Sequence, residues 1–92
     1  MIRGKKRVWG FDEQERALLF EATADLPELR ALVERAEPRP ELGKVWVVTT
    51  TVDELDAMYD LVEALTDATR SRKRLDLLDG LRASLCTSMD GF

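Results

Sequence analysis

The stretch VWVVTT, residues Val45–Thr50, constrains the fold of this chain more than any other feature. Its β-branched residues and its tryptophan favour a β-strand. Apolar side chains stand at both odd and even positions, so we expect both faces of this strand to be buried. A lone strand leaves its backbone N–H and C=O groups unpaired, which is costly when they are buried. The fold must therefore supply a partner strand and cover for two faces.

Three segments could pair with this strand, and the sequence does not choose among them. The first is Val8–Phe11, which reads as a short extended piece. The second is Leu18–Ala22, whose alternating apolar residues fit a strand as well as a helix. The third is the same strand in a second copy of the chain. The first two choices keep the sheet very small, whereas the third makes the protein a dimer.

Four helices are predicted around the strand, near residues 12–24, 26–36, 52–69 and 72–89. Asp12 with Glu15 forms a capping pattern for the first helix, and Thr51 with Glu54 forms a capping box for the third. The fourth helix is indicated by leucines at helical spacing, at positions Leu75, Leu78, Leu81 and Leu85.

The second helix has its own boundary signals. Asp25 is the expected N-cap, and Pro27 suits the first turn. Pro38 is expected to end the helix, because a residue that precedes proline is pushed out of the helical conformation. The following stretch EPRPELGK, residues 37–44, is predicted to be a loop.

These elements predict an α+β fold, a small helix-dominated single domain with a minimal sheet. The chain has 92 residues, enough for one domain with a thin core. Residues 1–8 are expected to form a flexible basic arm, and residues 9–92 the globular domain. The third and fourth helices should form an antiparallel pair that covers the sheet.

Composition argues against most enzyme classes. The chain has no histidine and one cysteine, so it offers no Ser–His or Cys–His pair and no His-ligated or Cys-rich metal site. It also lacks the glycine-rich motifs that cradle phosphates. We therefore predict a protein that is not an enzyme, with no cofactor and no bound metal. The single cysteine and the lack of long apolar runs predict a cytoplasmic protein without a membrane segment.

The carboxyl-terminal stretch SLCTSMDGF, residues 84–92, is predicted to be the end of the last helix. Gly91 can adopt the left-handed conformation of a Schellman cap, and Phe92 can then contact the last turn. Cys86 has no histidine to activate it, and the negative potential at a helix carboxyl terminus disfavours a thiolate. We therefore interpret this segment as structural.

Five acids recur at spacings of three and four residues and should line one face of the third helix. This acidic stripe comprises Asp53, Asp56, Asp60, Glu63 and Asp67. A straight row of carboxylates does not converge on a cation, so we do not predict a metal site. If the stripe is more than a solvated face, it should bind a basic protein segment.

The amino terminus carries the opposite charge. This basic arm comprises Arg3, Lys5, Lys6 and Arg7. Cations beside the aromatic residues Trp9 and Phe11 could grip a nucleic-acid backbone. However, the pI is about 4.8 and no predicted helix has a basic face, so nucleic acid is not the expected partner.

The leading functional hypothesis is a small non-enzymatic interaction or regulatory module that acts as a homodimer through charge-complementary surfaces. Trp46 and Val48 are the predicted interface residues, because the other elements leave one face of their strand poorly covered. The first alternative is a nucleic-acid accessory protein that uses the basic arm. The second alternative is a metal-dependent enzyme based on the carboxylates of the acidic stripe.

Overall fold

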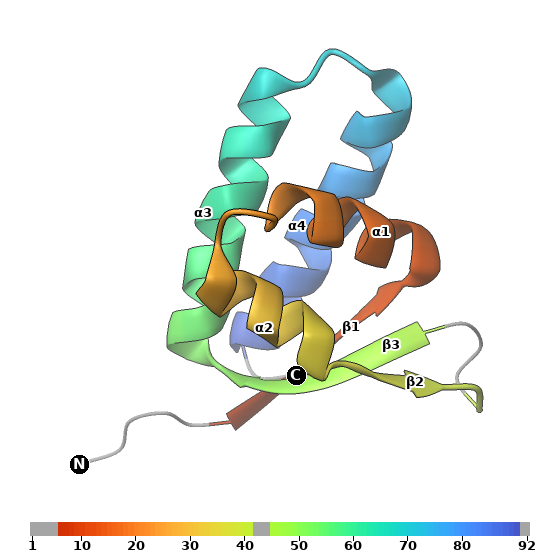
Figure 1. Ribbon diagram of the computed structural model, residues 1–92, viewed down its shortest axis with the longest axis vertical. Coiled ribbons are helices and arrows are strands. Elements are labelled where there is room, and N and C mark those ends of the chain that lie inside the picture. Colours follow the sequence, from red (N-terminus) through yellow and green to blue (C-terminus); the bar gives the residue numbers. More distant parts are fainter. Residues whose placement is uncertain (1–5, 42–44, 91–92) are drawn as a thin grey trace.

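The structure is a computed structural model that describes residues 6–41 and 45–90. The elements, in chain order, are β1 (Lys6–Asp12), α1 (Glu13–Ala22), α2 (Pro27–Arg35), β2 (Glu37–Arg39), β3 (Val45–Thr51), α3 (Val52–Ala68) and α4 (Arg72–Asp90). The three strands form an antiparallel sheet in the order β1-β3-β2, and the helices gather on one side of it (Figure 1). The predicted α+β fold is confirmed. None of the helices described is both long and apolar enough to cross a membrane.

The partner of the central strand is the segment near Val8–Phe11, the first of the three candidates. β1 pairs with β3 along its whole length, from Lys6 opposite Thr51 to Asp12 opposite Val45. The stretch Leu18–Ala22 is helical and belongs to α1. The sheet therefore completes its central ladder within one chain, without a strand from a second copy.

Both predicted capping patterns are present, and each one converts a strand directly into a helix. Asp12 ends β1, and its carboxylate accepts a hydrogen bond from the backbone N–H of Glu15 at 2.8 Å. Thr51 ends β3, and its hydroxyl accepts from the backbone N–H of Glu54 at 3.2 Å. In both boxes the glutamate carboxylate accepts a hydrogen bond from the backbone N–H of the capping residue. These local signals fix where α1 and α3 begin.

The predicted N-cap of the second helix was wrong by one residue. Leu26, not Asp25, is the N-cap of α2, and no side-chain hydrogen bond caps the helix. Pro27 explains the shift, because a residue that precedes proline is kept out of the helical conformation. The backbone of Leu26 has φ −123° and ψ 82°, so the helix starts at Pro27 itself.

The loop predicted over residues 37–44 was wrong at its start. Glu37–Arg39 forms β2, which pairs with β3 so that Glu37 lies opposite Val47 and Arg39 opposite Val45. Pro38 does not prevent this pairing, because β2 lies at the edge of the sheet, where a missing N–H is tolerated. Residues 42–44 lie outside the described residues.

The boundary of the predicted basic arm also needs correction. The structure places Lys6, Arg7 and Val8 in β1, so the sheet begins inside the segment that we assigned to the arm. Residues 1–5 lie outside the described residues, and so does the Schellman cap predicted at Gly91 and Phe92. Removing residues 1–7 would therefore delete the first two residues of a strand.

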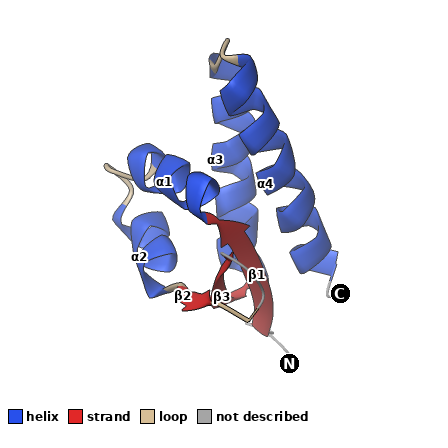
Figure 2. Ribbon diagram, turned by 90° about the vertical axis from the view of Figure 1, so that its right-hand side faces the viewer, coloured by secondary structure: helices blue, strands red, loops and turns tan. Residues whose placement is uncertain are grey.

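The core lies between the sheet and the four helices (Figure 2). Trp9 and Phe11 of β1 point into it with ring centroids 4.8 Å apart, and Val48 of β3 lies opposite Trp9. The helices contribute Leu18, Leu19, Leu32, Val33, Leu55, Met58, Val62, Leu78, Leu81 and Leu85, all buried. The antiparallel helix pair that we predicted is α3 and α4.

The last helix is fastened to the first strand by two hydrogen bonds. The indole N–H of Trp9, which is fully buried, donates to the hydroxyl of Ser84 at 2.9 Å. The hydroxyl of Ser88 donates to the backbone carbonyl of Val8 at 2.9 Å. Because β1 is an edge strand, the contact at Val8 also occupies a backbone acceptor that could otherwise pair with another chain.

The opposite side of the sheet carries none of the described helices. Side chains alternate along a strand, so the residues between the buried ones face outward. A Cβ added to Gly10 would lie 3.3 Å from Cγ1 of Val45 and 3.8 Å from Cγ2 of Val47, which puts these three positions on one face. We call this the outer sheet face. Its centre comprises Val8, Gly10, Val45, Val47 and Thr49, and the same register places Lys6, Asp12, Glu37, Arg39 and Thr51 around them on this face.

Replacing Ser84 by Ala should destabilise the protein, because the buried N–H of Trp9 would lose its acceptor. A buried donor without a partner costs about 1–3 kcal/mol, and urea unfolding measures the loss. Cys86→Ala in the same helix is the control, since Cys86 is exposed and should change the free energy of unfolding by less than about 0.5 kcal/mol. Equal stability of the two variants would contradict the proposed contact.

Candidate functional site

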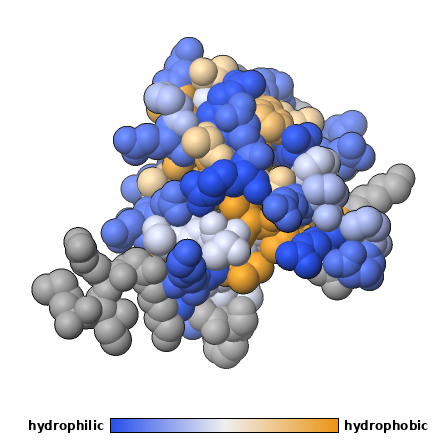
Figure 3. All heavy atoms as spheres, turned by 60° about the horizontal axis from the view of Figure 1, so that its bottom comes forward, coloured by the Kyte–Doolittle hydropathy of each residue, from blue (hydrophilic) through white to orange (hydrophobic). Residues whose placement is uncertain are grey.

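The outer sheet face contains apolar residues that the core does not bury. Val8 is 60% exposed, the most exposed large apolar residue described, and Val45 and Val47 are partly buried. Gly10 adds no side chain, so it leaves the centre of the face flat. Figure 3, which brings the lower side of the molecule in Figure 1 forward, shows hydrophobic surface that is bordered in part by hydrophilic residues. An apolar patch with a polar rim is typical of a protein contact.

The two predicted interface residues do not lie on this face. Val48 is 3% exposed and packs in the core of the same chain. Trp46 is partly buried, and the Arg16 guanidinium covers its ring at 3.8 Å from the centroid. Arg16 also lies 4.5 Å from the centroid of the Phe20 ring. The outward apolar residues of β3 are therefore Val45 and Val47, the neighbours in sequence of the residues that we predicted.

The acidic stripe lies along α3, as predicted, but its members differ in their surroundings. Asp53, Asp56, Asp60 and Asp67 are exposed, whereas Glu63 is half-buried. Arg82 of α4 forms an ion pair with Glu63 at 3.7 Å. The same carboxylate raises the pKa of Tyr59 above its ordinary value of 10.0, because it favours the protonated hydroxyl as a hydrogen-bond donor and disfavours a second negative charge beside it. Glu63 thus joins α3 to α4 and is not a free site for a partner.

The stripe does not form a metal site within the described part of the chain. Across residues 6–41 and 45–90, no three His, Cys, Asp or Glu side chains are grouped so that they could hold a metal ion. The exposed members of the stripe point along one helix face and do not converge.

The basic arm is divided between different environments. Lys6 is exposed at the start of β1, and Arg7 is half-buried opposite Thr50 on the inner face of the sheet. Arg3 and Lys5 lie outside the described residues. Lys6 and Arg7 therefore lie on opposite faces of the sheet.

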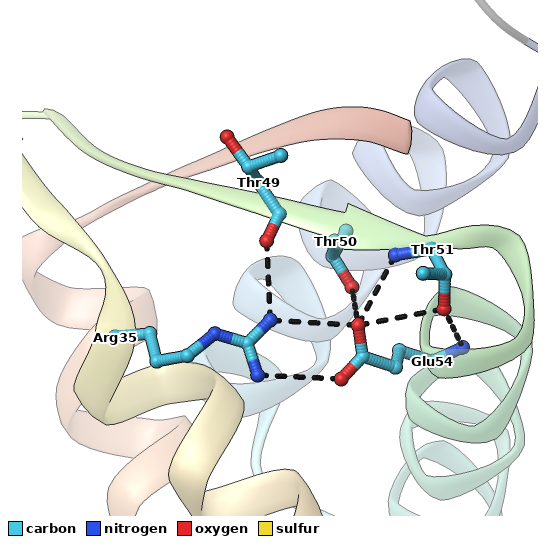
Figure 4. A network of polar contacts seen from close by, with 5 residues as sticks. All are labelled: Arg35, Thr49, Thr50, Thr51 and Glu54. Atoms are coloured by element: carbon cyan, nitrogen blue, oxygen red, sulfur yellow. Dashed lines mark hydrogen bonds and ion pairs between the residues drawn. The ribbon is translucent and has the colours of Figure 1, made fainter. Parts of the chain in front are cut away.

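A polar network joins α2, β3 and the first turn of α3 (Figure 4). The Arg35 guanidinium bonds both carboxylate oxygens of Glu54, at 3.3 and 3.4 Å, and donates to the backbone carbonyl of Thr49 at 3.1 Å. Glu54 also accepts from the hydroxyl of Thr50 at 2.8 Å and from the backbone N–H of Thr51 at 3.1 Å. A single carboxylate therefore connects three elements.

The surroundings of Glu54 lower the pKa of its carboxyl group. Burial favours the neutral carboxyl, but the hydrogen bonds from Thr50, Arg35 and Thr51 and the charge of Arg35 outweigh burial, so the pKa of Glu54 falls below its ordinary value of 4.5. Each of these partners is engaged within the protein. The network therefore has a structural role, because it links α2 and β3 to the first turn of α3.

Comparison with known protein families, with curated proteins and with solved structures finds no match to this chain. Its function must therefore be argued from the surfaces described above.

Replacing Glu54 by Gln should lower the free energy of unfolding at neutral pH. It should also make that free energy depend less on pH in the acid range. The folded protein holds the pKa of Glu54 below that of the unfolded chain, so the wild type is fully stabilised above about pH 4.5 and loses that contribution as pH falls through the lower folded-state pKa. Gln can still accept the capping hydrogen bond but loses the charge that pairs with Arg35, so the variant should be less stable by up to about 1 kcal/mol at pH 7. Thermal unfolding at several pH values should show the two proteins converging in acid, and a constant difference would contradict the assignment.

Proposed function

We propose that this protein is a small non-enzymatic interaction module that pairs with a second copy of itself through the outer sheet face. The observation that carries the proposal is that all four helices lie on one side of the sheet, while Val8, Val45 and Val47 lie on the other. Apolar surface that is removed from water contributes about 25 cal/mol per Å², so covering this face is favourable.

The charges at the edge of the outer sheet face support a second copy of the chain as the binding partner. Asp12 on β1 and Arg39 on β2 both lie opposite Val45, on its two sides. A two-fold axis that runs along β3 would lay β1 of one copy over β2 of the other, with Asp12 above Arg39 at two symmetric places. A surface that carries both signs in this arrangement is complementary to itself, as a two-fold interface requires.

The size of the face predicts a weak dimer. A seven-residue strand is about 23 Å long, and neighbouring strands lie about 4.8 Å apart, so the three strands offer only a few hundred Å². A stable interface buries about 800 Å² on each partner. The core of one chain is complete without the second, since fourteen apolar side chains are buried within it. We therefore expect a folded monomer that associates as its concentration rises.

Replacing Val47 by Lys should abolish the association, because the axis along β3 brings the two copies of this position together, and replacing Val8 by Lys should do the same, because it places a charge on a desolvated surface. Sedimentation velocity over a wide concentration range measures the effect, with the wild type shifting towards a dimer and both variants remaining monomers. Ala64→Lys is the matched control, since Ala64 is exposed on α3 and away from the sheet. A wild type that stays monomeric at every concentration, or a control that dissociates the dimer equally, would refute the proposal.

A further inference from the structure

The helical side of the molecule carries a second feature, a groove between α2 and the first half of α3. Two adjoining hollows of about 370 and 320 Å³ form it, and both are lined by Glu28, Leu29 and Ala57. Leu26 and Pro27 line one end of the groove, and Leu32 lines the other. Its floor is therefore mainly apolar, and it shares no residue with the outer sheet face.

Leu26 occupies a position where leucine contributes little to the stability of the fold. It occupies the N-cap of α2, where Ser, Thr, Asp or Asn would accept a hydrogen bond from the helix and where leucine is among the poorest residues. Its side chain is also 38% exposed, so part of its apolar surface stays in water. A leucine that does not cap its helix and is only partly covered is accounted for if it contacts a binding partner.

The rim of the groove carries one sign of charge. Glu28, Asp53 and Glu54 line the first hollow, and no Lys or Arg is among the residues that line either one. Asp56 and Asp60 of the acidic stripe continue along the same helix, and neither forms an ion pair within residues 6–41 and 45–90. An apolar floor between carboxylates complements a helix that presents leucine-like side chains between Lys and Arg residues.

We propose that this groove binds a basic amphipathic helix of a partner protein. The apolar side chains of that helix would rest against Leu26, Leu29 and Ala57, and its cations would meet the carboxylates of Glu28 and Asp53. The inference rests on the proposed function only in treating the protein as a binding module. It does not require the dimer, because the groove and the outer sheet face are separate surfaces.

The test uses the full chain and a synthetic, fluorescently labelled helical peptide of about 16 residues. The peptide carries leucines at i, i+4, i+7 and i+11, with Lys and Arg flanking them. Fluorescence anisotropy should show saturable binding that weakens with added salt. A peptide with the same leucines and with Glu in place of Lys and Arg should not bind. Equal binding of the two peptides would overturn the proposal.

Replacing Leu26 by Ser separates binding from folding. Serine is a good N-cap, so the variant should melt at the same temperature as the wild type or higher. Its affinity for the basic peptide should nevertheless fall about tenfold or more, as expected for an apolar anchor. Val8→Ser is the matched control on the outer sheet face and should bind the peptide as the wild type does. Unchanged affinity of Leu26→Ser would refute the groove as the site.

A second pair of variants tests the charges. Asp53→Asn at the groove should weaken binding several-fold, about 1 kcal/mol or less when converted from the affinity ratio, whereas Asp67→Asn at the far end of the same helix should have little effect. Equal effects of the two would mean that the peptide follows the whole stripe and not the groove.

Two further measurements identify the occupant and separate this inference from the proposed dimer. Deleting residues 1–5 should leave peptide affinity unchanged, and a large gain in affinity would assign the groove to the chain's own basic arm, against the proposal. The monomeric variant Val8→Lys should bind the peptide with wild-type affinity, and loss of binding there would show that the site needs the dimer. If the wild type does not form a dimer but still binds the peptide, the proposed dimer is refuted and the proposed groove is not.

Discussion

The antiparallel pairing of β1 with β3 is the interaction on which the rest of the structure depends. It satisfies the backbone of the most apolar strand, and it places Trp9 and Phe11 beside Val48 at the centre of the core. It also joins the beginning of the chain to its end, because Ser84 and Ser88 of α4 bind the side chain of Trp9 and the backbone of Val8. Without this ladder, β3 would lose its longest backbone partner, and α4 would lose the two hydrogen bonds that attach it to the sheet.

The same ladder explains why one face of the sheet is covered and the other is not. Asp12 and Thr51 lie at opposite ends of it, and each is both the last residue of a strand and the N-cap of a helix. α1 and α3 therefore leave the sheet from opposite ends, and both turn to the same side (Figure 2). With α2 and α4 on that side too, none of the described helices remains for Val8, Val45 and Val47. The open face follows from the topology of the chain.

The charged residues divide into those that hold the fold together and those that face outward. Arg35 with Glu54 and Arg82 with Glu63 connect different elements, and Arg16 shields the edge of the core at Trp46. Asp53, Asp56 and Asp60 remain outside such contacts within the described residues. Surface ion pairs contribute little to stability, so acids that lack a partner are better explained by solubility or by recognition than by folding. The proposed groove assigns one such role.

The sequence by itself determined most of the local structure for which a signal acts within a few residues, with the N-cap of α2 as the exception. The capping boxes at Asp12 and Thr51, the leucine spacing of α4 and the β-branched run of β3 each predicted an element correctly, because hydrogen bonds and side-chain periods over a single turn are readable in one dimension. Only the tertiary structure decided which strands pair and which side of β3 faces the helices. β2 was missed because Glu37–Arg39 is stabilised by β3 and not by its own residues, and the outward position of Val45 and Val47 was not predicted because both faces of β3 are apolar. Pairing and facing depend on contacts between residues that are distant in the chain, and no local pattern encodes them.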